Sequence, residues 1–321
     1  MRYRELGTGG PPVSEVGLGT WRGVSTGDQP AADRLVRTAL DLGITLFDTA
    51  DSYGDAQEAL GRALAGVPAD AHLVSTKVYF GQDGAVHGLS RTRLVAAADR
   101  CLRALRADRI GLLSAHRFDD SVPLAEIVAT FGELIAAGKV GFWGVSEWTA
   151  EQIGRACALA DELGVPRPVA NQPQYSVLWR VPEGRVLPAC RELGLGTVAF
   201  WPLAQGVLTG KYRPQSPPPA GSRAAGELGR ATMRQLMVDP LLERVELFDR
   251  LARHHGMNTA GLAVAWVLNR CGVTSALVGA SAPEQLADSA AASGVRLTDG
   301  VMELTDKIFA GCVYDDVTAT G

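Results

Sequence analysis

Eight short apolar segments, each followed by a longer segment with helical character, constrain the fold of this chain more than any other feature. Alternation of strands and helices predicts parallel strands joined by right-handed crossovers. Eight such units within 321 residues predict a (β/α)8 barrel, the TIM barrel, formed as one domain from residue 1 to residue 321. The candidate strands are Val16–Gly19, Ile44–Phe47, Leu73–Thr76, Ile110–Ser114, Gly141–Val145, Val169–Asn171, Thr197–Phe200 and Ser275–Val278.

Two segments lie outside this repeating pattern. Arg2–Glu5 and Pro12–Glu15 flank a glycine-rich turn and predict a β-hairpin that covers the N-terminal mouth of the barrel. Residues 211–237, rich in Pro, Gly, Ser and Arg, predict a long loop after the seventh strand. Loops of this length inside compact domains are usually lids or binding loops, and the alternative is a disordered insertion. Helix starts are predicted at Thr149, with Gln152 in the first turn, and at Ser281, with Pro283 and Glu284 behind it.

Composition narrows the class of protein. A net charge of −4 argues against a nucleic-acid-binding protein, and we expect no membrane insertion because no apolar run approaches the ~20 residues that span a bilayer. The five cysteines are scattered without a C-x-x-C pair, which favours a reducing cytoplasm and argues against a metal site. No G-x-G-x-x-G follows the first strand, so a Rossmann fold is not indicated, and "GVLTGKY" departs from a phosphate-binding loop.

Titratable residues recur where the predicted strands end. Asp48 and Tyr53 follow the second strand, Lys77 the third and His116 the fourth. Chemistry in this architecture belongs to the C-terminal face of the barrel, so we expect the four side chains to meet there. A Lys77 ammonium held by Asp48 would lower the pKa of Tyr53, and a shift of ~2 units corresponds to about 2.7 kcal/mol. A neutral His116 would hydrogen-bond the substrate oxygen, which suits proton transfer to a developing alkoxide.

At these residues the chain resembles the aldo-keto reductase family over nearly its whole length. "GITLFDTADSYGDAQEALGRAL" is similar to the family signature, "STKV" carries the lysine and "LLSAHRFD" carries the histidine. "GKVGFWGVSEW", "NQPQY" and "PLAQGVLTGKY" are similar to later blocks, and the last favours the branch that includes the potassium-channel β subunits and related bacterial reductases. The resemblance implies that Asp48, Tyr53, Lys77 and His116 form the family's catalytic tetrad, with Tyr53 as the general acid.

The resemblance also implies an NADPH/NADP⁺ site at the same end of the barrel. The nicotinamide end would contact Thr20, Trp21, Asp48, Ser146, Gln172 and the stacking ring of Phe200. The phosphates and ribose would contact Leu203, Gln205, Lys211, Arg223, Gly279, Ser281, Gln285 and Asp288. NADPH is expected rather than NADH because Lys211 and Arg223 would hold the 2′-phosphate.

Four positions depart from the family pattern. Glu147 stands where many members have Asn, and Phe200 replaces the usual Tyr or Trp. Trp201 replaces a Ser, which removes a side-chain contact to phosphate, and Gln285 stands near a basic residue of some members.

The expected activity is NADPH-dependent reduction of an aldehyde or ketone to an alcohol. The substrate would be a small carbonyl compound, with a keto-sugar nucleotide or natural-product ketone as an alternative. The pocket would be lined by Trp21, Tyr53, Tyr79, Phe80, His116 and Trp148, and left open by the short tail after Phe309. A second reading is a non-catalytic NADP(H)-binding sensor or auxiliary subunit, although His116 stands where the well-known channel subunits carry Asn. A monomer or a homo-oligomer fits the sequence.

Overall fold

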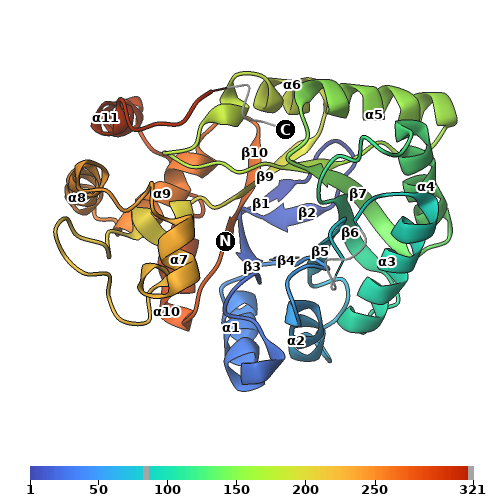
Figure 1. Ribbon diagram of the computed structural model, residues 1–321, viewed down its shortest axis with the longest axis horizontal. Helices are drawn as coiled ribbons and strands as arrows, with labels where there is room; N and C mark the ends of the chain where they lie inside the picture. The colour runs from blue at the N-terminus through green and yellow to red at the C-terminus, as the bar shows by residue number, and fades with distance from the viewer. Residues whose placement is uncertain (82–86, 317–321) are drawn as a thin grey trace.

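The computed structural model describes residues 1–81 and 87–316, and its central feature is a closed barrel of parallel strands (Figure 1). The strands follow one another in chain order, and the last, β10, pairs with the first, β3. This arrangement confirms the predicted (β/α)8 barrel. The barrel strands are β3 Val16–Gly19, β4 Leu46–Asp48, β5 Leu73–Val78, β6 Ile110–Ala115, β7 Val140–Ser146, β8 Ala170–Gln172, β9 Gly196–Phe200 and β10 Val273–Val278.

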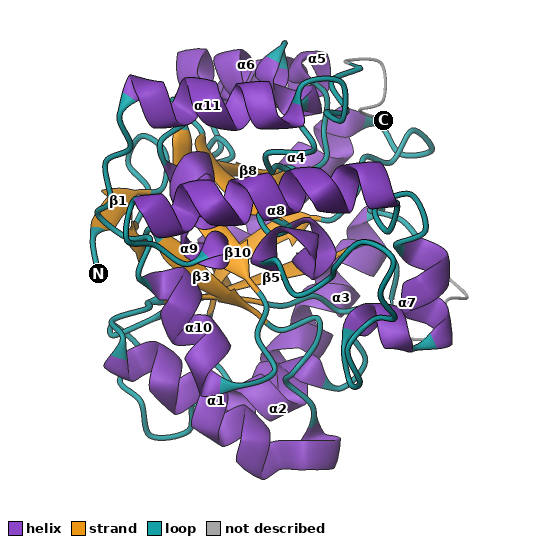
Figure 2. Ribbon diagram, turned by 90° about the vertical axis from the view of Figure 1, so that its left-hand side faces the viewer, coloured by secondary structure: helices purple, strands orange, loops and turns teal. Residues whose placement is uncertain are grey.

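Helices surround the barrel, and two of them form an additional outer layer. The inner ring consists of α1 Gln29–Asp41, α2 Ala56–Ala63, α3 Arg91–Leu105, α4 Leu124–Ala136, α5 Ala150–Leu163, α6 Val186–Leu193, α9 Thr259–Leu268 and α10 Pro283–Ala290. Figure 2 shows α8, Asp239–His254, lying outside α9, with α11, Asp299–Phe309, beside α8. Because α9 is covered by the barrel on one side and by α8 on the other, its residues from Gly261 to Leu268 are all buried.

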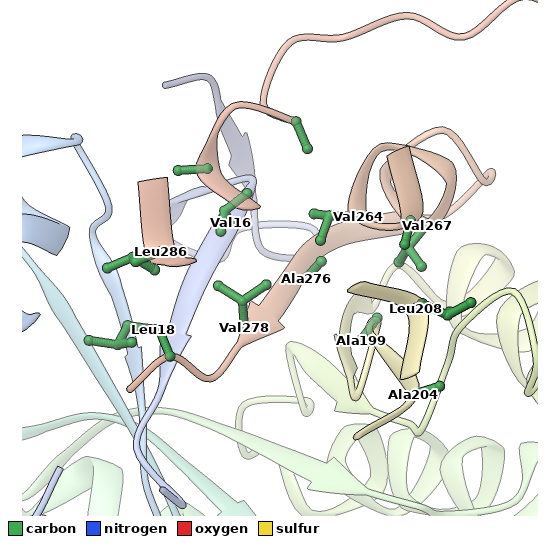
Figure 3. Close-up of a cluster of buried hydrophobic side chains, with 14 of the residues drawn as sticks. Val16, Leu18, Ala199, Ala204, Leu208, Val264, Val267, Ala276, Val278 and Leu286 are labelled. Atoms are coloured by element: carbon green, nitrogen blue, oxygen red, sulfur yellow. The ribbon is translucent and has the colours of Figure 1, made fainter. Parts of the chain in front are cut away.

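The outward faces of the strands supply the larger part of the apolar core. Figure 3 shows side chains of β3 and β10 meeting those of α9 and α10. The branched residues on these strands suit a sheet that is buried on both faces, and their removal from water stabilises the fold by about 25 cal/mol per Å². The labelled residues are Val16, Leu18, Ala199, Ala204, Leu208, Val264, Val267, Ala276, Val278 and Leu286.

The predicted N-terminal hairpin is present and closes one end of the barrel. Strands β1, Tyr3–Glu5, and β2, Pro12–Ser14, pair antiparallel. Leu6 and Val13 are fully buried and pack against apolar residues that point into the barrel. The hydroxyl of Ser14 accepts from the backbone N–H groups of Thr45 and Leu46, which tie the hairpin to the start of β4. This end is therefore filled by side chains, and the opposite end is left for chemistry.

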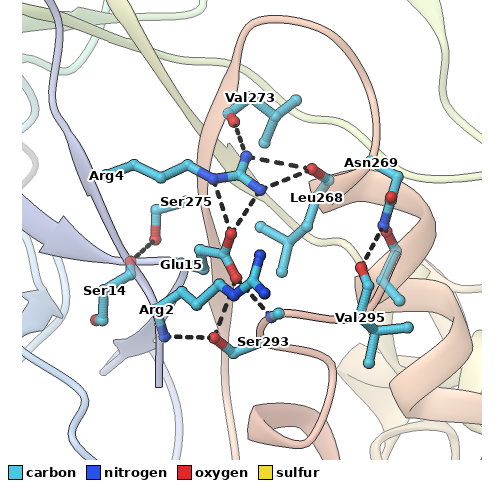
Figure 4. A network of polar contacts seen from close by, with 12 residues as sticks. Arg2, Arg4, Ser14, Glu15, Leu268, Asn269, Val273, Ser275, Ser293 and Val295 are labelled. Atoms are coloured by element: carbon cyan, nitrogen blue, oxygen red, sulfur yellow. Dashed lines mark hydrogen bonds and ion pairs between the residues drawn. The ribbon is translucent and has the colours of Figure 1, made fainter. Parts of the chain in front are cut away.

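A buried carboxylate anchors the same end of the molecule (Figure 4). Glu15 forms an ion pair with Arg4 at 2.6 Å and accepts from the N–H of Gly294 and the hydroxyl of Ser293. Burial would raise the pKa of Glu15, but the Gly294 amide and the Arg4 guanidinium hold it below its ordinary value. The Arg4 side chain also donates to the carbonyl oxygen of Val273, so the hairpin is joined to β10.

Local helix signals are confirmed in one case and corrected in another. Thr149 caps α5, and its capping box with Gln152 is complete. Helix α10 instead begins after Ala282, and the Ser281 hydroxyl donates to the Gln285 side chain instead of accepting from a backbone N–H of the helix. Residues 211–237 also differ from a plain loop, because they contain η4, Arg223–Ala225, and α7, Glu227–Thr232. The remaining short helices are η1 Thr26–Asp28, η2 Val181–Glu183 and η3 Ala204–Thr209.

Candidate active site

An ion pair between Lys77 and Asp48 lies at the C-terminal end of the barrel. The Nζ atom of Lys77 is 2.6 Å from Oδ2 of Asp48 and 2.7 Å from the carbonyl oxygen of Thr49. Asp48 stands opposite Ser75 in the β4–β5 ladder, and Lys77 follows on the same face because side chains alternate along a strand. Both charged side chains are buried, with 0% exposure for Lys77 and 3% for Asp48. Their close pairing offsets part of the cost of removing two charges from water.

The carboxylate of Asp48 has further donors that fix its orientation. Its Oδ1 atom accepts from Gln172 Nε2 at 2.8 Å and from the Ser75 hydroxyl at 3.2 Å. Gln172 stands beside Ser146 in the β7–β8 ladder, and the Ser146 hydroxyl donates to the Gln172 carbonyl oxygen at 2.9 Å. Side chains from β5 and β8 therefore converge on the carboxylate at the end of β4.

Tyr53 and His116 complete the predicted group of four. The Lys77 ammonium lies 5.1 Å from the centroid of the Tyr53 ring, and the Tyr53 and His116 rings are 6.1 Å apart at 77°. The loop that carries Tyr53 is tied to β5 by the N–H of Asp51, which donates to the Lys77 carbonyl oxygen. The structure thus brings together all four residues of the predicted tetrad.

Burial dominates the ionisation of these groups. It raises the pKa of Tyr53 above the ordinary value, and the Lys77 ammonium opposes that rise only in part. The prediction that the pKa of Tyr53 is lowered was therefore wrong in direction. The loss of hydration disfavours the phenolate more than the Lys77 ammonium favours it. Burial would lower the pKa of Lys77, but Asp48 and Tyr53 together hold it above the ordinary lysine value. Tyr53 is consequently a neutral phenol at physiological pH.

His116 is neutral as expected. Burial, together with the Lys77 ammonium and the Arg117 guanidinium, lowers the pKa of His116 to about 2. The backbone N–H of His116 donates to the Val78 carbonyl oxygen, which continues the β5–β6 ladder. Its buried Nδ1 atom has no hydrogen-bond partner within residues 1–81 and 87–316. A neutral imidazole can hydrogen-bond a carbonyl oxygen without a change in its own charge.

The segments that follow β3 and β9 place aromatic rings beside Tyr53. Trp21 is 42% exposed, and its ring centroid is 6.4 Å from that of Tyr53 and 5.9 Å from that of Trp201. Trp201 has a φ of 57°, a left-handed conformation that is uncommon for a bulky residue. Phe200 ends β9 and contacts Trp201 edge to face at 5.5 Å. These rings offer flat apolar surface next to the tetrad.

Several residues expected to contact the cofactor's phosphates or ribose follow β9 or β10. Arg223 is half-buried, lies 5.1 Å from the Trp21 ring centroid and has no carboxylate at ion-pair distance in the described chain. Burial and the neighbouring Arg22 lower its pKa to about 10. Its weak contact to Gln205, at 3.4 Å, leaves the guanidinium free for a phosphate. Lys211 is exposed on the same segment, with its Nζ atom close to Gly206.

Some other residues of the expected cofactor site form hydrogen bonds with side chains of the same chain. The N–H and hydroxyl of Ser281 donate to Gln285 at 3.1 Å, and Asp288 accepts from the Asn258 side chain at 3.1 Å. Gly279 is exposed, Leu203 is half-buried, and Thr20 is fully buried with an unpartnered hydroxyl in the described part of the chain. An unpaired guanidinium, an orphaned hydroxyl and an exposed glycine fit a phosphate-bearing nucleotide.

Only some of the residues expected to line the substrate pocket lie beside the tetrad. Phe80 lies 5.1 Å from the His116 ring, so it stands beside the tetrad. Tyr79 contacts Phe80 at 5.0 Å and stacks on His87 at 6.1 Å. Trp148 is 0% exposed and packs against Phe118 in the outer core, so its expected place in an open pocket is corrected to a core position.

The tail after α11 contacts the segment between β8 and η2. Its Tyr314 stacks on Trp179 at 4.5 Å and pairs with the backbone of Leu178, between β8 and η2. The last five residues, 317–321, lie outside the described part of the chain.

Three further residues of the site were not singled out from the sequence. Ser75 precedes Lys77 by two positions, and this spacing on a strand could have shown that both face Asp48. Arg117 directly follows His116 and influences the same groups. Asp51 is buried and accepts from the N–H of Gly81 at 3.3 Å.

Glu147 occupies the position where many members of the family have Asn. Its φ is 59°, and its carboxylate accepts from the backbone N–H of Gln174 at 2.6 Å. Burial raises the pKa of Glu147, while the Gln174 amide and Arg117 oppose that rise. The side chain is therefore held at the end of β7 by the loop that follows β8.

The described residues contain neither a metal-binding cluster nor a membrane-spanning helix. No group of three or more His, Cys, Asp or Glu side chains in that part of the chain could hold a metal ion. Within the same residues, no helix combines the length and the apolar character needed to cross a membrane.

The chain is thus a (β/α)8-barrel protein in which Asp48, Tyr53, Lys77 and His116 meet at the C-terminal ends of the strands. Residues 15–310 match the model of the Aldo/keto reductase family. The chain therefore belongs to this family of oxidoreductases, which act on the carbonyl groups of small molecules and generally use NAD(P)H.

Individual relatives cover nearly the whole chain. A protein of Oryza sativa subsp. japonica named "Probable voltage-gated potassium channel subunit beta" is 35% identical over 321 residues, which span 97% of this chain and 96% of the relative. An Arabidopsis thaliana protein of the same name is 34% identical over 298 residues, 90% of each chain. The "L-glyceraldehyde 3-phosphate reductase" of Escherichia coli strain K12 is 31% identical over 300 residues, 90% of this chain and 86% of the relative.

Proposed function

We propose that this protein reduces an aldehyde or ketone to an alcohol with NADPH, and that Tyr53 supplies the proton. The observation that carries the proposal is the buried Lys77–Asp48 pair beside a neutral tyrosine and a neutral histidine. Bound NADPH would supply the hydride. Every other part of the reaction is assigned to side chains of the site.

The proposed role of Tyr53 follows from its surroundings. Its phenol stays protonated at neutral pH because burial raises its pKa, so it has a proton to donate to the developing alkoxide. Loss of that proton leaves a phenolate, which the nearby Lys77 ammonium stabilises. Asp48 keeps Lys77 charged and fixed in place.

The proposed role of His116 is to position the carbonyl group. A neutral imidazole next to the Tyr53 ring can donate a hydrogen bond to the carbonyl oxygen, which orients that oxygen toward the phenol. Phe80 and Trp21 restrict the approach of the substrate from either side.

Preference for NADPH over NADH is part of the proposal. Arg223 is a half-buried cation without a carboxylate partner in the described residues, and Lys211 is an exposed cation on the same segment. Two such cations suit a 2′-phosphate, which only NADPH carries.

Two classes of substrate are compatible with this activity. The Escherichia coli relative is named for reduction of L-glyceraldehyde 3-phosphate, which supports a small phosphorylated aldehyde for this chain. A keto-sugar nucleotide or natural-product ketone is the alternative.

The test is incorporation of label from the cofactor. The protein is incubated with NADPH deuterated at C4 and with a panel of aldehydes and ketones, and the alcohols are analysed by mass spectrometry. A deuterated alcohol supports the proposal. No labelled product from any carbonyl, with NADPH bound, would contradict it.

An auxiliary subunit that binds NADP(H) without turnover is the second candidate. It is favoured by the names of the plant relatives. Tight NADPH binding without product, together with co-purification of a membrane protein, would support this function. Sustained turnover of any carbonyl at a physiological concentration would favour the reductase. We further propose that the chain acts in the cytoplasm as one domain, either alone or as a homo-oligomer.

A further inference from the structure

Arg117 is a cation at the edge of the tetrad and has no acidic partner within the described part of the chain. The residue directly follows His116 at the end of β6, and its side chain is half-buried. Its Nη1 atom donates to the His116 carbonyl oxygen at 2.5 Å. No carboxylate lies within ion-pair distance of it in residues 1–81 and 87–316. A guanidinium that loses water without gaining a carboxylate is costly, so such a group is expected to serve a ligand.

The position of Arg117 relative to the other site residues shows where that ligand would lie. Its Cζ atom is 5.8 Å from the centroid of the Phe80 ring, and that ring is 5.1 Å from His116. The guanidinium is also close enough to oppose the rise in the pKa of Tyr53 and to add to the fall in the pKa of His116. Arg117 therefore stands on the substrate side of the residues that would hold the carbonyl group.

Glu147 is an acid whose ionisation Arg117 influences without forming an ion pair with it. The Glu147 carboxylate accepts instead from the Gln174 backbone N–H at 2.6 Å. Lys77 is paired with Asp48, so Arg117 is the cation of this group that has no carboxylate paired with it in the described residues.

We propose that Arg117 binds a carboxylate or phosphate group of the carbonyl substrate, so that the preferred substrates are anionic aldehydes or ketones. The guanidinium fork matches the oxygens of either anion, and it can form two parallel hydrogen bonds with them. An anion held there, with the carbonyl between Tyr53 and His116, places the two functional groups of the substrate a few bonds apart. This inference rests on the proposed carbonyl reduction at the same site.

The kinetic test compares charged compounds with matched neutral ones. Glyceraldehyde 3-phosphate is paired with glyceraldehyde, and succinic semialdehyde with its methyl ester. Wild-type protein should give a higher kcat/KM for one or both charged members, and Arg117→Met should reduce the charged-to-neutral ratio about tenfold or more, mainly through KM. Arg117→Lys should retain part of the ratio. Arg34→Met, an exposed arginine on α1, is the matched control and should leave the ratio unchanged.

The outcomes separate this inference from the proposed function. Turnover of neutral and charged compounds with equal kcat/KM, or a charged-to-neutral ratio that survives in Arg117→Met, would overturn the role of Arg117. No turnover of any compound would contradict the reductase itself. In that case, calorimetric titration with glycerol 3-phosphate and with succinate, with and without NADP⁺, still tests the anion site. Binding by wild type and loss in Arg117→Met supports the site, whereas no binding by wild type overturns it.

Discussion

Oδ1 of Asp48 and Nε2 of Gln172 are 2.8 Å apart, although 124 residues separate them in the chain. This contact crosses the barrel opening, and the other carboxylate oxygen of Asp48 holds Lys77. The carboxylate thus joins the residue expected to support Tyr53 to a residue expected to contact the nicotinamide.

Loss of Gln172 should affect the site more than the fold. Gln172→Leu removes a donor to Asp48, so we expect weaker NADPH binding and a lower kcat, with a cost in stability of about 1 kcal/mol. Fluorescence titration with NADPH and urea denaturation measure the two effects. A loss of stability above about 3 kcal/mol with unaltered NADPH binding would assign Gln172 a purely structural role.

Breaking the Lys77–Asp48 pair should destabilise the protein as well as inactivate it. Lys77→Met or Asp48→Asn leaves the other member without its full partner, and the cost for a buried pair is about 3–5 kcal/mol. The double variant should lose less stability than the sum of the two single variants, because no unpaired charge remains. Urea denaturation of the wild type, the two single variants and the double variant gives the coupling free energy between the two groups. Losses of stability that are strictly additive would show that the two groups are independent.

Tyr53 should titrate above the ordinary tyrosine value. Burial raises its pKa, so the phenol stays protonated as the pH rises through about 10. Ultraviolet difference spectra of wild type against Tyr53→Phe isolate its phenolate signal. A phenolate that forms near pH 8 in the ligand-free protein would show that Lys77 outweighs burial.

Glu15 should stabilise the hairpin end of the barrel in a pH-dependent manner. Its pKa is lowered on folding, so its contribution is present above the ordinary carboxyl value near 4.5 and is lost as the pH falls through the lower folded value. At pH 7, Glu15→Gln should lower the free energy of unfolding by about 1.5–3 kcal/mol. The difference between the two proteins should shrink below pH 4.5, and a difference that grows there would contradict the assignment.

Selection between the two cofactors should depend on Arg223. Arg223→Met removes an unpaired cation, so the Kd for NADPH should rise about tenfold while that for NADH changes little. Arg230→Met, an exposed arginine on α7, serves as the control. Equal weakening of both cofactors would place Arg223 at the adenine or the pyrophosphate rather than at the 2′-phosphate.

The barrel and the tetrad were predictable because they follow from local patterns. The strand Val16–Gly19 has its predicted bounds, and the even spacing of apolar strands carries Asp48 and Lys77 to the same end. Helix starts within residues 211–237 were not predictable, because many glycines and prolines there obscure the short η4 and α7. Local sequence also gave no measure of burial. For that reason Trp148 was expected in a pocket, and the pKa of Tyr53 was expected to fall.

The central claim is that Tyr53 donates the proton in an NADPH-dependent carbonyl reduction. The most direct measurement is kcat/KM for the best carbonyl substrate in wild type and in Tyr53→Phe, with the Kd for NADPH determined in both. We predict a loss of about 10²–10⁴-fold in kcat/KM with a Kd for NADPH that changes less than about threefold. Equal kcat/KM in the two proteins would contradict the claim.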